Sequence, residues 1–312
     1  MSVPTLTQDG AALRTAVAAA VQEVVAVPEA TLLPILCAML AGGHALLEGI
    51  PGVGKTLLAR TVARCVDAEF RRIQFTNDLM PSDVVGTAVW RPDAGRFQFV
   101  KGPLFANFVL ADEINRTSPR TLSCLLEAME QGRVSIEGRT VELAAPFTVL
   151  ATRNPVEFQG TFPLPEAVLD RFLVRVELGY PDAATERALY AGHDREHGLA
   201  DVAPVLRQDE LQALQRQCAQ VEVAELCAEY VYRVVAATRS HAHVALGASP
   251  RAALAWLRAA KAHAVLHGRG YVLPDDLKAL AHAALAHRIF LREGGDAGPL
   301  VREIVAGTAV PV

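Results

Sequence analysis

The sequence predicts an α/β fold, with a parallel β-sheet covered by helices, that is followed by a smaller all-helical domain. Apolar runs of strand length predict the sheet, because parallel strands are buried on both faces; they occupy residues 45–47, 108–111 and 147–152. Two alternating segments interrupt this pattern and predict hairpin insertions. After residue 182, apolar residues recur at helical spacing instead. We therefore expect an α/β domain over residues 1–181 and an all-helical domain, without strands, over residues 182–312.

The composition is that of a globular protein. Hydrophobic residues make up 51% of the chain and charged residues 21%, which excludes a disordered chain. A net charge of -4 and only 6% aromatic residues supply neither the basic surface nor the stacking side chains of a typical nucleic-acid-binding protein. We therefore expect no nucleic-acid partner.

No segment predicts a membrane span or an oxidising compartment. Residues 30–47 are uncharged, but Pro34 and the Gly42-Gly43 pair break the run, so we interpret it as a buried helix followed by a strand. The N-terminus lacks a basic region ahead of an apolar run, and no signal peptide is expected. The five cysteines lack C-x-x-C spacing and predict neither a disulfide framework nor a zinc site: Cys37, Cys65, Cys124, Cys218 and Cys227. These features predict a soluble, cytoplasmic protein.

Two helices are predicted ahead of the first strand. Residues 11–27 are rich in alanine and valine, with polar residues at helical intervals, and predict an amphipathic helix. Pro28 interrupts it, because proline disfavours helix in the residue before it and suits a helix start. A second helix over residues 28–40 then leads into the strand at residues 45–47.

A phosphate-binding loop follows that strand. Residues 49–56 fit the pattern G-x-x-x-x-G-K-S/T, in which the loop N–H groups and a helix N-terminus point at phosphate oxygens. Lys55 would reach the β- and γ-phosphates, and the Thr56 hydroxyl would ligate Mg²⁺. The alternative is a glycine-rich turn with a chance Lys-Thr, which the flanking strand and helix disfavour. The expected nucleotide-binding residues are Gly49, Ile50, Pro51, Gly52, Val53, Gly54, Lys55, Thr56 and Leu57.

The next strand is expected at residues 72–76, and a turn leads from it into a short helix near Pro81. Residues 87–90 and 96–99 alternate on either side of turn residues and predict the first hairpin, over residues 86–99. Trp90 and Phe97 lie on this hairpin. They could form a surface for a partner, but we favour the interpretation that they pin the hairpin to the body of the protein.

Two acids mark the end of the buried strand at residues 108–111. Sites in α/β proteins lie at the carboxyl ends of parallel strands, where Asp112 could hold the Mg²⁺ shell and Glu113 could orient and polarise the attacking water. Two adjacent acids could instead form a solvated turn, an interpretation that the upstream phosphate loop disfavours.

Similar sequence patterns predict the remaining elements of the α/β domain. A helix is expected at residues 119–131 and a second hairpin at residues 134–143. Asn154 stands just past the strand at residues 147–152, where it could hydrogen-bond the γ-phosphate or the attacking water. A last strand is expected at residues 173–178. Helical segments at residues 252–266 and 277–290 dominate the rest of the chain.

Together these motifs resemble the AAA+ ATPases and, within them, the MoxR family. The phosphate loop is joined by Leu-Ala-Asp-Glu-Ile-Asn-Arg at residues 110–116, Ala-Thr-Arg-Asn-Pro at 151–155 and Leu-Asp-Arg-Phe at 169–172. Further stretches carry the same resemblance, at residues 75–83, 160–167 and 247–252. The resemblance covers about residues 25–290 and implies a P-loop AAA+ core with two hairpin insertions and a helical lid.

The resemblance implies a role for each matching residue. Asp112 would support Mg²⁺, Glu113 would activate water, and Asn154 would be the first sensor. Arg171 would be the arginine finger, which acts on the nucleotide of the neighbouring subunit. Arg251 would be the second sensor, by which the lid responds to the γ-phosphate.

The resemblance also implies ATP and Mg²⁺ as ligands, a homo-oligomeric ring of six subunits, and chaperone-like remodelling or maturation of a partner protein. A von Willebrand factor A domain protein is the adaptor that it implies. Three residues depart from the pattern of the family: Arg153 replaces Gln, Asn77 replaces Pro, and Gln159 replaces Glu. Of these, Arg153 would add a cation near the phosphates. The alternative functions are a nucleic-acid motor and a nucleotide-gated scaffold.

Two histidine patterns predict no metal site. Residues 193–197 fit the zinc-protease pattern H-x-x-E-H, but no stripe of apolar residues accompanies this segment to bury it beside a pocket. His263 and His267 share a helix face, yet the sequence shows no third ligand. We therefore expect these histidines to be structural or solvated.

Overall fold

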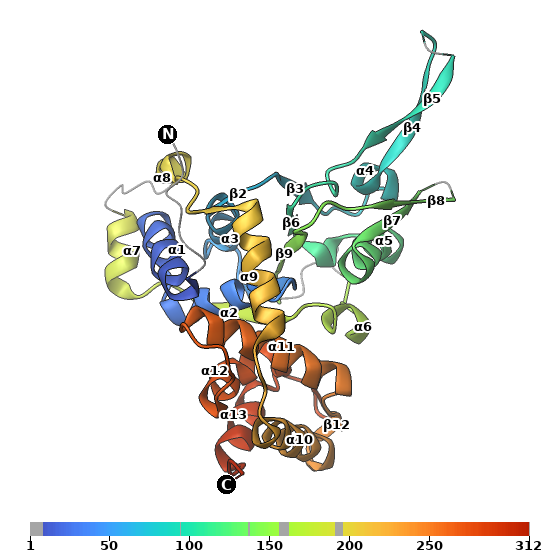
Figure 1. Cartoon of the computed structure of the whole chain (residues 1–312). Coiled ribbons are helices and arrows are strands. Elements are labelled where there is room, and N and C mark those ends of the chain that lie inside the picture. The colour runs from blue at the N-terminus through green and yellow to red at the C-terminus, as the bar shows by residue number, and fades with distance from the viewer. Residues whose placement is uncertain (1–8, 94, 137, 156–161, 191–195, 312) are drawn as a thin grey trace.

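The computed structural model describes residues 9–311, except residues 94, 137, 156–161 and 191–195. An α/β part occupies the upper half of the view in Figure 1, and the helices that follow residue 220, coloured orange to red, lie below it. One long hairpin projects from the α/β part, away from the rest of the molecule.

The α/β part is built on a five-stranded parallel sheet with the strand order β10-β1-β9-β6-β3. This arrangement confirms the predicted fold class. Because all five strands run the same way, their carboxyl ends lie along one edge of the sheet. The strands are β1 (Ala45–Gly49), β3 (Phe70–Gln74), β6 (Phe108–Asp112), β9 (Thr148–Arg153) and β10 (Val174–Leu178).

Helices cover both faces of this sheet. Alternate strand residues point to opposite faces, so Leu47 and Leu110 join one apolar cluster, whereas Leu46 and Val109 join another. The first cluster includes side chains of α1 (Gly10–Val24), α2 (Glu29–Leu40) and α3 (Lys55–Arg64). The second includes side chains of α4 (Pro81–Val85) and α5 (Pro119–Gln131). Burial on both faces accounts for the unbroken apolar runs of the sequence.

Both predicted hairpins are present. The first consists of β4 (Gly86–Arg91) and β5 (Arg96–Lys101), the second of β7 (Arg133–Ile136) and β8 (Arg139–Glu142). The expectation that Trp90 and Phe97 pin the first hairpin to the body is wrong. These side chains are 50% and 68% exposed, and their rings contact each other edge to face with centroids 5.2 Å apart. Phe99 lies nearer the base of the hairpin, where it pairs with Ala88, and it packs against the core.

The helical part contains five longer helices: α9 (Gln208–Gln220), α10 (Glu225–Ser240), α11 (Pro250–Leu266), α12 (Pro274–Leu285) and α13 (Gly298–Gly307). Two short helices precede them, α7 (Ala183–Tyr190) and α8 (Glu196–Asp201). A single apolar cluster runs from these helices into the first face of the sheet, so the two parts share one core. Within it, α11 packs on α2, and α12 packs on β10.

The expectation of a strand-free C-terminal domain is wrong in detail. β12 (Val244–Leu246) pairs with β13 (Phe290–Leu291), and β11 (Leu206–Arg207) pairs with β2 (Val66–Asp67) of the α/β part. Strands of two or three residues are too short to produce a periodic sequence signal. The β11–β2 pair also means that the chain returns to the α/β part after residue 182. The boundary between residues 181 and 182 stays a prediction.

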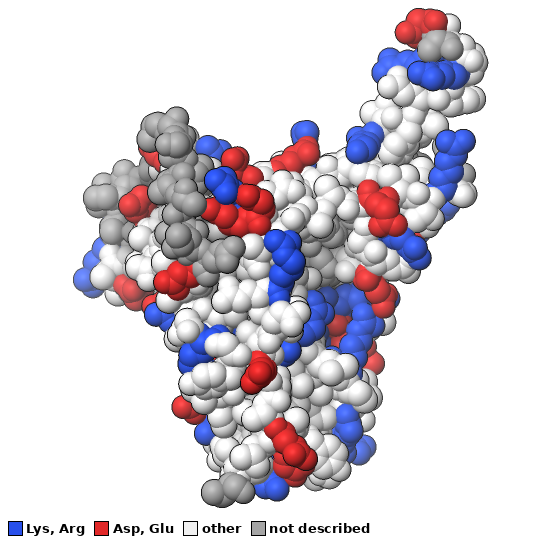
Figure 2. Space-filling view, in the orientation of Figure 1, with Lys and Arg blue, Asp and Glu red and all other residues white. Residues whose placement is uncertain are grey.

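The surface charges, the cysteines and the apolar character of the helices bear on the expected partners and compartment of the protein. On the face shown in Figure 2, Lys and Arg side chains are interspersed with Asp and Glu and form no continuous basic surface. All five cysteines are unpaired, and four of them are buried. None of the described helices combines the length and the apolar character that a membrane crossing requires.

Candidate active site

The phosphate loop connects the carboxyl end of β1 to the first turn of α3. Gly52 and Gly54 have φ angles of 84° and 89°, which side-chain-bearing residues rarely adopt. At Gly49, a Cβ atom would lie 2.4 Å from the carbonyl oxygen of Leu178. Only glycine fits these positions without strain. The loop can therefore wrap tightly and present the unpaired N–H groups of the first turn of α3 to an anion.

Lys55 lies at the centre of this loop and is 8% exposed. Its ammonium donates to the carbonyl oxygens of Gly49 at 2.5 Å and Ile50 at 2.8 Å, and to Asn154 Oδ1 at 2.8 Å. Burial lowers the pKa of Lys55, and the negative charges of Asp112 and Glu113 oppose that shift. The structure thus brings Lys55 and Asn154, predicted from separate motifs, into direct contact.

Asp112 is the buried acid of the site, at 4% exposure. Thr152 donates a 2.5 Å hydrogen bond to its Oδ1, and the Thr56 hydroxyl lies 3.3 Å from both of its oxygens. Arg72 donates to Oδ2 from Nε at 3.1 Å and from Nη2 at 2.6 Å. A carboxylate beside a hydroxyl is the hard oxygen donor set that suits Mg²⁺, so Asp112 and Thr56 fit this ion.

The sequence analysis did not identify Thr152 and Arg72 as site residues, although the position of each in its strand is a partial signal. Thr152 is adjacent to Arg153, the last residue of β9, at the same sheet edge as Asp112. Arg72 and Gln74 are two residues apart in β3 and therefore share one face of this strand, next to β6. Strand order was the missing information, because nothing local to either segment says that β3 and β9 flank β6.

Glu113 has a left-handed backbone conformation, with φ 57°, which is uncommon for a residue other than glycine. Its side chain accepts hydrogen bonds from Arg116 Nη1 at 2.8 Å, Gln74 Nε2 at 3.2 Å and Asn154 Nδ2 at 3.4 Å. Its backbone N–H donates to the Thr152 hydroxyl at 2.9 Å. The turn and these contacts direct the carboxylate toward Asn154 and the phosphate loop, where it can orient a water molecule.

Arg153 does not add an uncompensated cation to the site. Its Nη1 lies 3.1 Å from Glu48 Oε1, and Arg175 approaches the other oxygen of that carboxylate at 3.7 Å. Glu48 is buried at 6% exposure, so the pair is held firmly. The pair lines a cavity of about 800 Å³ that opens beside Gly49 and Ile50, at the start of the phosphate loop.

Arg171 and Arg251 lie at the opposite edge of the sheet from the phosphate loop. The backbone N–H of Leu173 donates to the carbonyl oxygen of His44 at 2.8 Å, which places residues 171–173 at the amino ends of β1 and β10. The phosphate loop leaves β1 at the opposite end, and five strand residues at about 3.3 Å each span about 16 Å. Arg251 of α11 lies beside Arg171, because both bind the Glu130 carboxylate. Neither arginine reaches the phosphate loop of its own chain.

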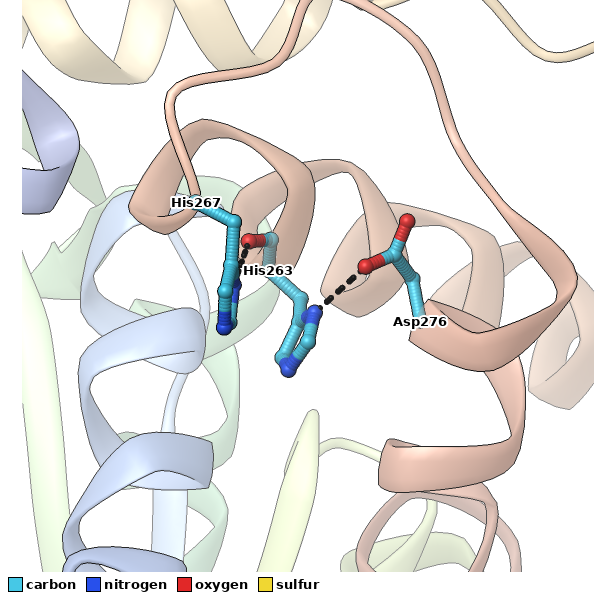
Figure 3. A group of neighbouring side chains, drawn as sticks. All are labelled: His263, His267 and Asp276. Carbon is cyan, nitrogen blue, oxygen red and sulfur yellow. Dashed lines mark hydrogen bonds and ion pairs between the residues drawn. The ribbon is translucent and has the colours of Figure 1, made fainter.

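The histidine pair at residues 263 and 267 has a third neighbour, Asp276, that the sequence did not reveal (Figure 3). His263 Nδ1 donates to Asp276 Oδ1 at 2.6 Å, and Arg269 binds both oxygens of that carboxylate, at 2.5 and 2.7 Å. His267 Nε2 accepts a 2.6 Å hydrogen bond from Arg14. Although burial opposes the shift, Arg269 and His263 hold the pKa of Asp276 well below its usual range. Two arginines already satisfy these groups, so the cluster is a structural charge network.

The other histidine pattern, H-x-x-E-H at residues 193–197, begins with residues that lie outside the described part of the chain. Residues 160 and 161, which begin the stretch at residues 160–167, and Gln159 lie outside it as well.

Comparison with known proteins agrees with this geometry. Residues 44–174 match the ATPase family associated with various cellular activities (AAA), and residues 236–306 match the AAA lid domain. YeaC of Bacillus subtilis (strain 168) is 47% identical, over 89% of this chain and 88% of its own length. Chaperone MoxR1 of Mycobacterium tuberculosis is 42% identical, over 87% of this chain and 74% of its own.

Two further matches extend the comparison. Protein MoxR of Paracoccus denitrificans is 32% identical, over 84% of each chain. A crystal structure of a candidate ATPase from Cytophaga hutchinsonii superposes with a TM-score of 0.85 at 36% identity, and the match covers 97% of both chains.

Proposed function

The chain belongs to the MoxR family of AAA+ ATPases, and from this premise we propose that each nucleotide site is completed by the neighbouring subunit of a ring. One observation carries the proposal. Arg171 and Arg251, which the family resemblance assigns to the γ-phosphate, lie together at the sheet edge opposite the phosphate loop. A pair of arginines that cannot reach the nucleotide of its own chain is available to that of an adjacent subunit.

The residues at the carboxyl edge of the sheet would bind and orient the nucleotide. Lys55 and the loop N–H groups would hold the phosphates, while Thr56 and Asp112 would hold Mg²⁺. A Mg²⁺ ion bound there supplies positive charge that offsets the charge of the phosphate oxygens. Glu113 would accept a hydrogen bond from the attacking water, and Asn154, which contacts both Lys55 and Glu113, would align that water with the γ-phosphate.

The arginines would then make hydrolysis depend on assembly. Phosphoryl transfer is catalysed mainly by positioning and by neutralising charge on the transferred group, and an arginine supplied in trans contributes about 10³–10⁵ in rate. In this chain the second sensor would act in trans together with the finger, because Glu130 links the two arginines. A subunit outside a ring would bind ATP and hydrolyse it slowly.

The biological role follows from the relatives. MoxR1 of Mycobacterium tuberculosis is named a chaperone. We assign this chain the same kind of work, in which a six-membered ring uses ATP to remodel or mature a partner protein, with a von Willebrand factor A domain protein as adaptor. The five unpaired cysteines support the cytoplasm as its compartment. The mixed charges in Figure 2 favour a protein partner over a nucleic acid.

Mixed rings test the proposal. Arg171→Ala rings should bind ATP but not hydrolyse it, and Lys55→Ala rings should fail to bind it. Mixing the two variants should restore hydrolysis, with a maximum near equal proportions, because intact loops then face intact arginines. Arg233→Ala, which removes an exposed arginine from α10, is the matched control and should be fully active. Rings that assemble but stay inactive at every mixing ratio contradict the proposal.

A further inference from the structure

Glu130 connects the two arginines that the proposed function places in trans. It lies next to the last residue of α5, and its Oε2 accepts from Arg171 Nη2 at 2.9 Å. Its Oε1 accepts from Arg251 Nη2 at 3.1 Å. Each oxygen therefore serves one arginine, and a single carboxylate bridges the α/β part and the lid.

A second acid extends this arrangement. Asp170 Oδ2 lies 3.6 Å from Arg251 Nε, and Asp170 Oδ1 accepts from Arg288 Nε at 2.8 Å. Arg288 is 6% exposed and also donates to the carbonyl oxygens of Phe172 and Leu173. Charges thus alternate in the order Arg171, Glu130, Arg251, Asp170 and Arg288. The buried end of this series is fixed, whereas Arg251 is 51% exposed at its side chain.

The surroundings suit an oxyanion. A cavity of about 390 Å³ lies beside the series, and it is lined by four arginines against two acids: Arg171, Arg251, Arg258, Arg288, Glu130 and Asp170. Both acids are already paired, so the lining carries excess positive charge. Among the described residues, no acceptor binds Arg251 Nη1, which remains available to an incoming oxygen. Although partial burial opposes the shift, Arg171 and Arg251 lower the pKa of Glu130, and its carboxylate stays ionised at neutral pH.

We infer that Glu130 is a positioning residue, whose carboxylate holds Arg171 and Arg251 at the spacing in which they act together on the γ-phosphate of the neighbouring subunit. A carboxylate and a phosphate can each accept paired N–H groups of arginine through two of their oxygens. Long arginine side chains have many rotamers, and a bridging carboxylate removes this freedom before the nucleotide arrives. This inference rests on the proposed function, because it requires the arginines to act in trans.

Kinetics of assembled rings test the inference. Glu130→Ala should lower kcat at least tenfold and change KM for ATP less than twofold, because the loop that binds ATP is intact. Glu130→Asp keeps both oxygens and should recover part of the loss, whereas Glu130→Gln keeps one acceptor and should not. Glu127→Ala is the matched control, because it removes another carboxylate of the same helix. The Glu127 carboxylate accepts a hydrogen bond from Ser135 and pairs with no arginine of the described part of the chain. This control variant should leave kcat unchanged.

Mixing separates this role from a purely structural one. Glu130→Ala subunits have intact loops, so added Lys55→Ala subunits should restore hydrolysis, as they do for Arg171→Ala. Circular dichroism and light scattering verify folding and ring size for each variant. A wild-type kcat for Glu130→Ala, or a low kcat that mixing does not restore, overturns the inference if Arg171→Ala still complements. If Arg171→Ala also fails to complement, the proposed function itself is wrong.

Discussion

The Thr152 hydroxyl and the Asp112 carboxylate are joined by a 2.5 Å hydrogen bond between neighbouring strands of the sheet. The same hydroxyl accepts the backbone N–H of Glu113 at 2.9 Å. One threonine therefore orients the acid assigned to Mg²⁺ and also fixes the strained turn that carries the acid assigned to the attacking water.

Replacing Thr152 with valine keeps the shape and removes both hydrogen bonds. A hydrogen bond to a charged group contributes about 1.5–3 kcal/mol, so the Mg²⁺ concentration at half-maximal hydrolysis should rise roughly tenfold or more. Magnesium titration of the ATPase rate measures this shift. Thr148→Val is the control, because the Thr148 hydroxyl is buried in the same strand without a partner among the described residues. An unchanged magnesium requirement in Thr152→Val would exclude this role.

Replacing Glu113 with glutamine preserves the size of the side chain and removes the carboxylate that we propose as the base. Loss of a general base typically costs about 10²–10⁴ in rate, so hydrolysis should nearly stop while ATP binding persists. Equilibrium binding of a fluorescent ATP analogue and phosphate release measure the two properties separately. Substantial phosphate release by this variant would assign the base to another residue. Because the variant should retain ATP, it is also the form with which to capture the client protein.

His44 makes stability depend on pH. His44 is buried, accepts the N–H of Val149 at Nδ1 at 3.0 Å and donates from Nε2 to the carbonyl of Met129 at 2.9 Å. Burial lowers the pKa of His44 from 6.5 to about 4. Between these values the unfolded chain binds more protons than the native protein. The contribution of His44 to stability should therefore fall as pH falls from 6.5 to 4, by up to about 3 kcal/mol, and this contribution should level off below pH 4.

Urea denaturation at a series of pH values measures this slope. His287 is buried as well, and its lowered pKa contributes a slope of the same sign. The comparison is therefore between the wild-type protein and His44→Gln, which should be less stable at pH 7 and show a smaller loss between pH 6.5 and 4. Parallel curves for the two proteins would show that His44 does not carry this dependence.

The aromatic pair on the first hairpin should contribute little to stability. Trp90 and Phe97 contact each other edge to face, an interaction that contributes about 0.5–1.5 kcal/mol. Replacing both with alanine should lower the free energy of unfolding by no more than this. Phe99→Ala on the same hairpin should cost more, because Phe99 packs against the core and the Phe105 ring. Equal losses in the two variants would mean that the hairpin tip is packed.

Much of the phosphate site could be predicted from the sequence, because its residues follow strand ends. Asp112 ends a buried strand and Glu113 follows it directly, whereas Lys55 and Asn154 come shortly after two other buried strands. The carboxyl ends of parallel strands meet at one edge of the sheet. Local patterns therefore sufficed to place them together. The contacts of Thr152 and Arg72 with Asp112 could not be predicted in the same way, since they depend on strand order.

The chain's sequence alone determined the phosphate loop, the buried strands, both hairpins and the family, because each is written in a short stretch of residues. Only the tertiary structure decided that Arg171 and Arg251 meet at Glu130, on the edge opposite the phosphate loop. That meeting requires the lid to pack against the sheet through a shared apolar core. Packing between segments more than a hundred residues apart leaves no periodic signal in either segment, so the sequence could not show that Glu130 links these two arginines.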